Sequence, residues 1–131
     1  MGLDMYAFTL AERPAKDVDF LEEGSAVGEA LFYWRKHPDL HGWMAALYFE
    51  KGGKGVDGFD GPGTFNCCPL VLDPGDLDKL EKAVLSDALP HTEGFYFGAS
   101  HPRNKAATLE FIAKARNAIT EGKTVYYTSW W

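Results

Sequence analysis

Residues 33–43 carry the side chains of this chain that are best suited to bind a flat, negatively charged group. The segment reads Tyr-Trp-Arg-Lys-His-Pro-Asp-Leu-His-Gly-Trp. Aromatic rings and cations attract one another, and an arginine offers a planar fork of donors to an anion. A helix starting at Pro38 would add free N–H groups and partial positive charge. The segment therefore predicts an anion or nucleotide pocket at a strand-to-helix junction.

We expect the ligand surface to combine this segment with the first strand and the carboxyl-terminal rings. Its expected members are Tyr6, Trp34, Arg35, Lys36, His41 and Trp130. The competing interpretation is an edge strand with outward cations, followed by a helix whose Trp43 is core, because aromatic stripes at helical spacing are usually buried. The rings of residues 126–131 are expected to pack over the sheet or to meet a partner, for which a second copy of the chain is one option.

No pattern in the chain demands catalysis, and the preferred interpretation assigns no catalytic residue. If the protein is an enzyme, His41 would be the general acid or base and Arg35 would hold the charge of a phosphorylated or nucleotide substrate. Cys67 and Cys68 are adjacent and match no nucleophile signature, so structural thiols in a reducing cytosol are expected. The phosphate-binding pattern G-x-x-x-x-G-K-[ST] is absent.

Metal and cofactor binding are not predicted. His37 and His41 are four residues apart, a spacing that can bring two imidazoles to one ion. Zinc sites need three or four ligands, which would have to include His91 or His101. Since His37 precedes Pro38 and lies outside the regular helix, this geometry is unfavourable.

Composition indicates one domain, residues 1–131, with no membrane-spanning run and no recognisable signal peptide. The net charge of −6 argues against binding to duplex nucleic acid, which needs a basic surface. An acidic chain can instead inhibit a basic nucleic-acid-binding protein. For that alternative the relevant acids are Asp17, Asp19, Glu22 and Glu23.

Periodicity predicts an α+β fold with about five short strands and three helices. Strands are expected at residues 3–10, 30–36, 64–72, 95–97 and 123–131, and helices at about 38–51, 74–89 and 105–121. The stretches 11–25 and 52–63 are expected to be loops. The strands are short and partly polar, unlike strands covered on both sides, so a mixed or antiparallel sheet with helices mainly on one face is favoured.

Five short motifs in order resemble a family of small phage and prophage proteins. They are M-G-L-D-M-Y at residues 1–6, Y-W-R-K at 33–36, H-x-W at 41–43, an aromatic strand between Gly94 and Gly98 after Leu89-Pro90, and a tyrosine-serine-tryptophan tail at 126–130. Some family members carry a phosphoglycerate kinase label, which a single short domain does not support. The resemblance implies a phage or prophage protein in the host cytoplasm, with a counter-defence role.

Together these features predict a non-enzymatic binding protein. It would sequester an anionic or nucleotide ligand or block a host protein. A small enzyme using His41 and an acidic inhibitor of a nucleic-acid-binding host protein are the two alternatives. The predicted partners are a small anionic ligand or a host protein, with neither duplex nucleic acid nor a membrane among them.

Overall fold

A four-stranded antiparallel sheet is the framework of this protein. The computed structural model describes residues 2–20, 28–58, 61–93 and 98–131. The sheet has the strand order β2-β1-β6-β5. Its strands are β1 (Asp4–Leu10), β2 (Glu29–Arg35), β5 (Leu70–Leu72) and β6 (Thr124–Trp130). A separate two-stranded sheet pairs β3 (Val56–Gly58) with β4 (Gly61–Thr64). The predicted α+β class and the antiparallel sheet are confirmed.

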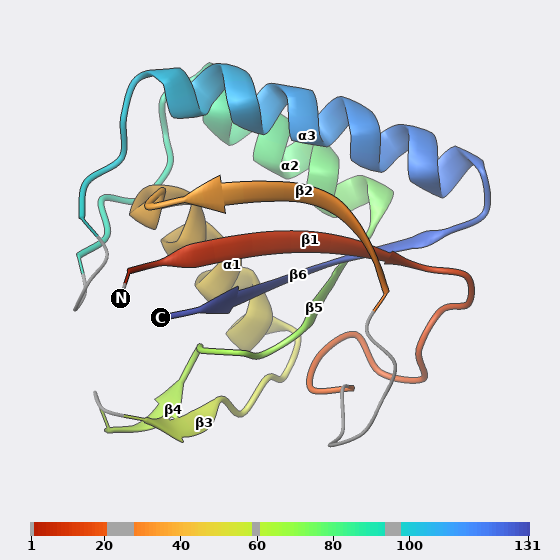
Figure 1. Cartoon of the computed structure of the whole chain (residues 1–131), viewed down its shortest axis with the longest axis horizontal. Helices are drawn as coiled ribbons and strands as arrows, with labels where there is room; N and C mark the ends of the chain where they lie inside the picture. Colours follow the sequence, from red (N-terminus) through yellow and green to blue (C-terminus); the bar gives the residue numbers. More distant parts are fainter. Residues whose placement is uncertain (1, 21–27, 59–60, 94–97) are drawn as a thin grey trace.

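The central strand β1 separates two faces of the sheet. Met5, Ala7 and Thr9 are buried, while the alternating residues between them are only partly covered. Successive side chains of a strand point to opposite faces, so β1 turns one side toward a core and the other outward. Figure 1 shows α1 (Pro38–Glu50) and α2 (Pro74–Leu85) behind the sheet, and α3 (Arg103–Thr120) along the top of the view, next to the β2 edge. The side that faces the viewer carries no helix in the described part of the chain.

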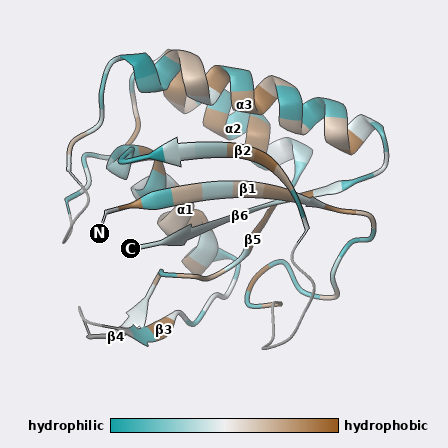
Figure 2. Cartoon of the chain, in the orientation of Figure 1, coloured by the Kyte–Doolittle hydropathy of each residue, from teal (hydrophilic) through white to brown (hydrophobic). Residues whose placement is uncertain are grey.

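The helices begin and end at residues suited to those positions. Pro38 occupies the first turn of α1, where its missing N–H costs nothing. At the start of α2, the Asp76 carboxylate accepts a hydrogen bond of 2.8 Å from the Asp73 backbone N–H. After α3, Gly122 has a φ of +89°, a left-handed conformation that glycine adopts at little cost. Figure 2 shows hydrophobic and hydrophilic residues alternating along α3, as expected of a helix with one buried side.

The core lies between the helices and the sheet. Trp34 of β2 meets the Phe111 ring of α3 at a centroid distance of 4.7 Å. Tyr127 of β6 is fully buried, as are Leu40 and Met44 of α1. Aromatic side chains bury a large area each, and this short chain fills its core with them. No helix in the described residues is long and apolar enough to cross a membrane.

Three local predictions differ from the structure. The glycine-rich stretch 52–63 contains β3 and the start of β4 rather than loop alone. The predicted strand 64–72 is divided, because β4 ends at Thr64 and β5 begins at Leu70; Pro69 lacks the N–H that a continuous strand needs. The second helix ends at Leu85, before Pro90. The predicted strand 95–97 lies outside the described residues.

A half-buried lysine joins α1, α2 and β5. The Lys51 ammonium group lies 2.6 Å from the Asp76 carboxylate and 2.7 Å from the Val71 carbonyl. The side chains of Lys51 and Asp76 are only 14% and 11% exposed. Removing one partner of a buried pair leaves an uncompensated charge, which costs more than the pair contributes. This contact therefore holds the sheet edge against the ends of two helices.

We expect Lys51→Ala to lower the free energy of unfolding by about 3 kcal/mol, because it strands the buried Asp76 carboxylate. Lys123→Ala is the matched control, since Lys123 pairs with Glu121 at the surface, where both side chains are well exposed. That change should cost under about 1 kcal/mol. Urea unfolding at pH 7 measures both values. Equal losses in the two variants would contradict the role given to Lys51.

Candidate functional site

The structure divides the six predicted site residues between the two sides of the sheet. Tyr6, Arg35 and Trp130 lie on the side without helices, and Lys36 follows directly after β2. Trp34 and His41 are buried on the helix side, with exposed fractions of 3% each. The predicted surface with all six residues is therefore not formed, and its exposed members make a smaller surface with new neighbours.

Two rows of directly paired residues form this surface at one end of the sheet. In the first row, Asp4 of β1 pairs with Arg35 of β2 on one side and with Trp130 of β6 on the other. In the second row, Tyr6 pairs with Tyr33 and Thr128. Neighbouring strands are about 4.8 Å apart, so Arg35 and Trp130 lie roughly 10 Å apart across Asp4. We call this surface the open-face patch; it consists of Asp4, Tyr6, Tyr33, Arg35, Thr128 and Trp130.

The aromatic rings of the patch are fixed by contacts with neighbouring residues but remain exposed to solvent. Tyr33 is 51% exposed and Trp130 is 64% exposed. The Tyr33 hydroxyl donates a hydrogen bond of 2.6 Å to the Asp4 carboxylate, and this bond raises the pKa of Tyr33. The Tyr6 ring lies 5.3 Å from that of Tyr33. Because Tyr33 is tied to Asp4 and supported by Tyr6, its exposed ring is positioned without being covered.

Two cations stand at the edge of the patch, next to the start of the chain. A methyl group placed on Gly2 would lie 3.1 Å from a guanidinium nitrogen of Arg35 and 3.2 Å from Cε of Lys36. Glycine at position 2 thus permits both side chains to pass close to the backbone. Beside them, Gly2, Asp4, Trp130 and Trp131 line a small cavity of about 80 Å³. This end of the sheet therefore combines the exposed rings, the carboxylate and the Arg35 cation of the patch with the neighbouring Lys36 cation.

Trp34 has a structural role instead of the predicted binding role. Its ring contacts Phe111 and lies 4.7 Å from the ring of Phe32. It belongs to the hydrophobic core between β2 and α3. Position 34 faces the helices because 33 and 35 face outward, and strand side chains alternate. A ligand on the open face cannot reach it.

His41 is also part of the interior, which removes it from contact with a substrate or ligand in this structure. Its Nδ1 lies 2.7 Å from the Tyr127 hydroxyl, and its ring stacks on Phe65 at 5.0 Å. Burial lowers the pKa of His41 to about 4, against a smaller raising effect of a hydrogen bond with the Phe65 backbone. The imidazole is therefore neutral at pH 7. It serves as a polar member of the core below the sheet.

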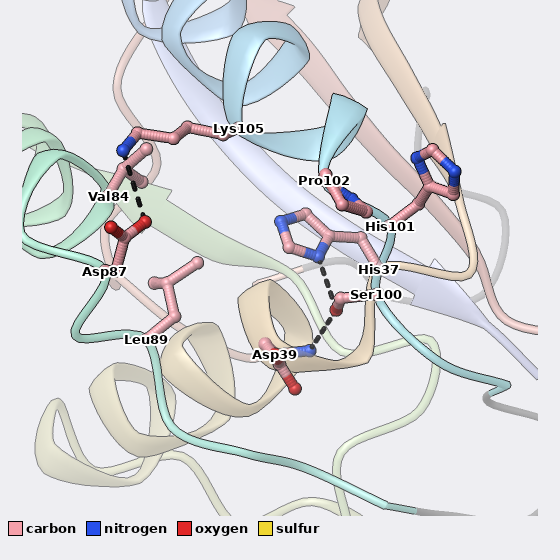
Figure 3. A pocket seen from close by; sticks show the side chains of 9 residues that line it. All are labelled: His37, Asp39, Val84, Asp87, Leu89, Ser100, His101, Pro102 and Lys105. Atoms are coloured by element: carbon pink, nitrogen blue, oxygen red, sulfur yellow. Dashed lines mark hydrogen bonds and ion pairs between the residues drawn. The ribbon is translucent and has the colours of Figure 1, made fainter.

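A larger cavity of about 400 Å³ lies on the helix side, between the beginnings of α1 and α3 (Figure 3). His37 forms part of its wall and is 4% exposed. The Nδ1 atom of His37 lies 2.8 Å from the Ser100 hydroxyl, which also accepts a 3.2 Å hydrogen bond from the Asp39 backbone N–H. Sequence patterns did not indicate this cavity.

The other candidates that the sequence suggested are metal ligands, the two thiols and the acidic residues of an inhibitory surface. In the described residues, no group of three or more His, Cys, Asp or Glu side chains is placed to hold a metal ion. Burial raises the thiol pKa of both Cys67 and Cys68, which disfavours the nucleophilic thiolate. Of the acids proposed for an inhibitory surface, Asp17 pairs with Arg13 at 2.6 Å, and Asp19 accepts hydrogen bonds from Tyr48 and the Lys54 backbone. Glu22 and Glu23 lie outside the described residues.

Sequence reasoning missed Tyr33 and Ser100 as site residues. Tyr33 had a usable signal, because a strand that exposes Arg35 also exposes the residue two positions earlier. The same alternation would have assigned Trp34 to the core. His41 shares the spacing of Met44 and Tyr48, which marks the buried side of α1. Ser100 had no local signal, since only the tertiary fold brings residue 100 beside residue 37.

Comparisons of the chain with protein-family models, with curated proteins and with solved structures gave no match.

We expect stability to fall between pH 7 and pH 5, since burial lowers the pKa of both His37 and His41 to about 4. An ordinary histidine in the unfolded chain titrates near 6.5, so the unfolded state binds more protons in this window and gains stability as the pH falls. Between pH 7 and pH 5, protonation linked to His41 alone should lower the free energy of unfolding by about 2 kcal/mol. Urea unfolding at both pH values measures it. His41→Gln should lose less on acidification than the native chain, and an equal loss would contradict the assignment.

Proposed function

We propose that this chain is a non-enzymatic binding protein that holds an anionic nucleotide ligand on its open-face patch. The observation that carries the proposal is the row Arg35–Asp4–Trp130, which places an exposed cation and an exposed indole on the same uncovered side of the sheet. Base stacking on an aromatic side chain contributes about 1–3 kcal/mol. A phosphate bound by a guanidinium adds a charge-assisted contact.

The positions of the patch residues suggest how such a ligand would lie. A base would stack against Trp130 or Tyr33, whose rings are the two most exposed of the patch. The phosphate would be held by Arg35 and Lys36 at the edge of the sheet near Gly2. The Asp4 carboxylate accepts one hydrogen bond from Tyr33 and has capacity for another, so it suits an amino or imino group of a base.

The geometry favours binding over turnover. The histidine expected to act as acid or base in an enzyme, His41, is buried below the sheet and bonded to Tyr127. The patch itself contains a stacking surface and charges but no histidine or cysteine. The patch is therefore suited to bind a ligand without converting it, and the biological effect would be sequestration of that ligand. The phage or prophage context implied by the sequence motifs stays a prediction.

We expect mono- and dinucleotides to bind saturably and to quench tryptophan fluorescence. Trp130→Ala should weaken binding by about tenfold or more, since it removes the stacking ring. Arg35→Gln should weaken binding by a similar factor and reduce its dependence on salt. Titration calorimetry and fluorescence quenching measure both effects.

Two matched variants serve as controls. Phe49→Ala removes another exposed ring, which lies on α1 away from the patch, and Lys79→Ala removes an exposed cation of α2. Neither should change the affinity. The proposal is wrong if nucleotides fail to bind at millimolar concentration, or if Trp130→Ala and Arg35→Gln bind as well as the two controls.

A further inference from the structure

β2 leaves one edge of the four-stranded sheet without a neighbouring strand. It stands first in the order β2-β1-β6-β5, so only β1 pairs with it in the described part of the chain. The opposite edge is covered, because the Val71 N–H of β5 donates to the Asp17 carbonyl at 2.8 Å. An unpaired edge strand presents a row of N–H and C=O groups that can accept a further strand. The edge at β2 is therefore the place where this sheet can be extended.

The pairing of β2 with β1 determines which backbone groups face outward. The Lys36 N–H donates to the Leu3 carbonyl at 2.9 Å, which makes these two residues a hydrogen-bonded pair. In antiparallel strands such pairs alternate with pairs whose N–H and C=O groups point away from each other. Arg35 and Tyr33 therefore direct their backbone groups away from β1. Both residues are exposed, and neither backbone N–H has a hydrogen-bond partner among the residues that the structure describes.

A groove of about 280 Å³ lies between the first half of β2 and α3. Its lining includes Ala30 and Leu31 of β2 and Lys114 and Asn117 of α3. Strand side chains alternate between the two faces of a sheet, so every second side chain of an added strand would point toward α3. Figure 1 shows α3 along this edge, and a second copy pairing through β2 would bring its own α3 to the same place. A single extended segment has no such conflict.

Charges at the two ends of β2 define the chemistry of the added segment. Glu29 begins the strand and Arg35 ends it, and neither side chain has an ion-pair partner within the described residues. On the α3 side of the groove, the Lys114 ammonium group is already 3.6 Å from the Glu110 carboxylate. Opposite charges directly across two strands stabilise their pairing. An antiparallel segment therefore fits best with an acidic residue at its start, opposite Arg35, and a basic residue at its end, near Glu29.

We propose that β2 binds an extended peptide segment of another protein as an additional antiparallel strand of the sheet. The backbones of Arg35 and Tyr33 exchange hydrogen bonds with alternate residues of the segment. The segment starts with an acidic residue, ends with a basic one and turns small β-branched side chains toward α3. In this kind of recognition the main-chain hydrogen bonds give affinity and alternate side chains give specificity. The proposal does not rest on nucleotide binding at the open-face patch.

The probe is the acetylated and amidated hexapeptide Glu-Val-Thr-Val-Thr-Lys, whose first and third residues would lie opposite Arg35 and Tyr33. It should shift the backbone amide resonances of these two residues saturably. N-methylation of its first and third residues removes the N–H groups that face β2 and should weaken binding by about tenfold or more. N-methylation of its second and fourth residues, whose N–H groups point away from β2, should leave the affinity unchanged. Absent shifts at millimolar peptide, or equal binding of the two methylated peptides, would overturn the proposal.

Two substitutions at one position separate the backbone of β2 from its side chains. Tyr33→Pro removes the outward N–H, and an edge strand tolerates proline where its missing N–H faces outward. This variant should bind the hexapeptide about tenfold more weakly. Tyr33→Ala keeps the N–H and removes only the ring, so it should weaken binding by no more than about threefold. A folded Tyr33→Pro protein that binds as tightly as Tyr33→Ala would contradict the proposal, and if it does not fold, the methylated peptides decide with the native chain.

Hydrogen exchange of the free protein measures whether the edge is available. The amides of Tyr33 and Arg35 should exchange rapidly, whereas the Lys36 amide, which donates to Leu3, should be protected. Adding the hexapeptide should slow the exchange at Tyr33 and Arg35. Protection of these two amides in the free protein that disappears on dilution would assign the edge to a second copy of the chain and would overturn the proposal.

Discussion

The pairing register of β1 is the constraint on which the rest of this structure depends. β1 lies between β2 and β6 and pairs with both, so each of its residues fixes a neighbour on either side. Met5 faces the core together with Trp34, and Asp4 faces outward together with Arg35. A slip of one residue would move every one of these side chains to the opposite face. The burial of the apolar side of β1 therefore also determines which residues form the open-face patch.

Consecutive residues at the end of β2 and in the turn after it are directed to opposite sides of the sheet. Arg35 lies on the open face, and Lys36 then adopts a φ of +55°, a left-handed conformation that costs a non-glycine residue roughly 1–2 kcal/mol. Its backbone N–H donates to the Leu3 carbonyl at 2.9 Å, which holds the turn against β1. His37 is directed into the interior and lines the cavity beside Ser100. One tight turn thus divides the cationic, aromatic segment of the sequence between the sheet surface and the helix layer.

Local patterns were sufficient for the elements but not for the site. Asp73-Pro74 and Gly122 marked real helix ends, because capping depends on residues close in sequence. Strand alternation predicts that Tyr6, Arg35 and Trp130 point outward. Whether the three side chains lie close together depends on the order of the strands in the sheet, which periodicity does not determine. Trp34 and His41 were assigned to the surface for their chemistry, although their positions in the strand and helix patterns favour the core. The cavity depends on the contact between residues 37 and 100, which no local pattern contains.

The most direct measurement is a map of the amide shifts that a saturating nucleotide causes in the ¹⁵N-labelled protein. If the uncovered side of the sheet is the binding surface, the largest changes should occur at residues 4–6, 33–36 and 128–131 and at the indole N–H of Trp130. Residues on the outer sides of α2 and α3 should change little. Changes concentrated on those helices, with none near Asp4, would contradict the account.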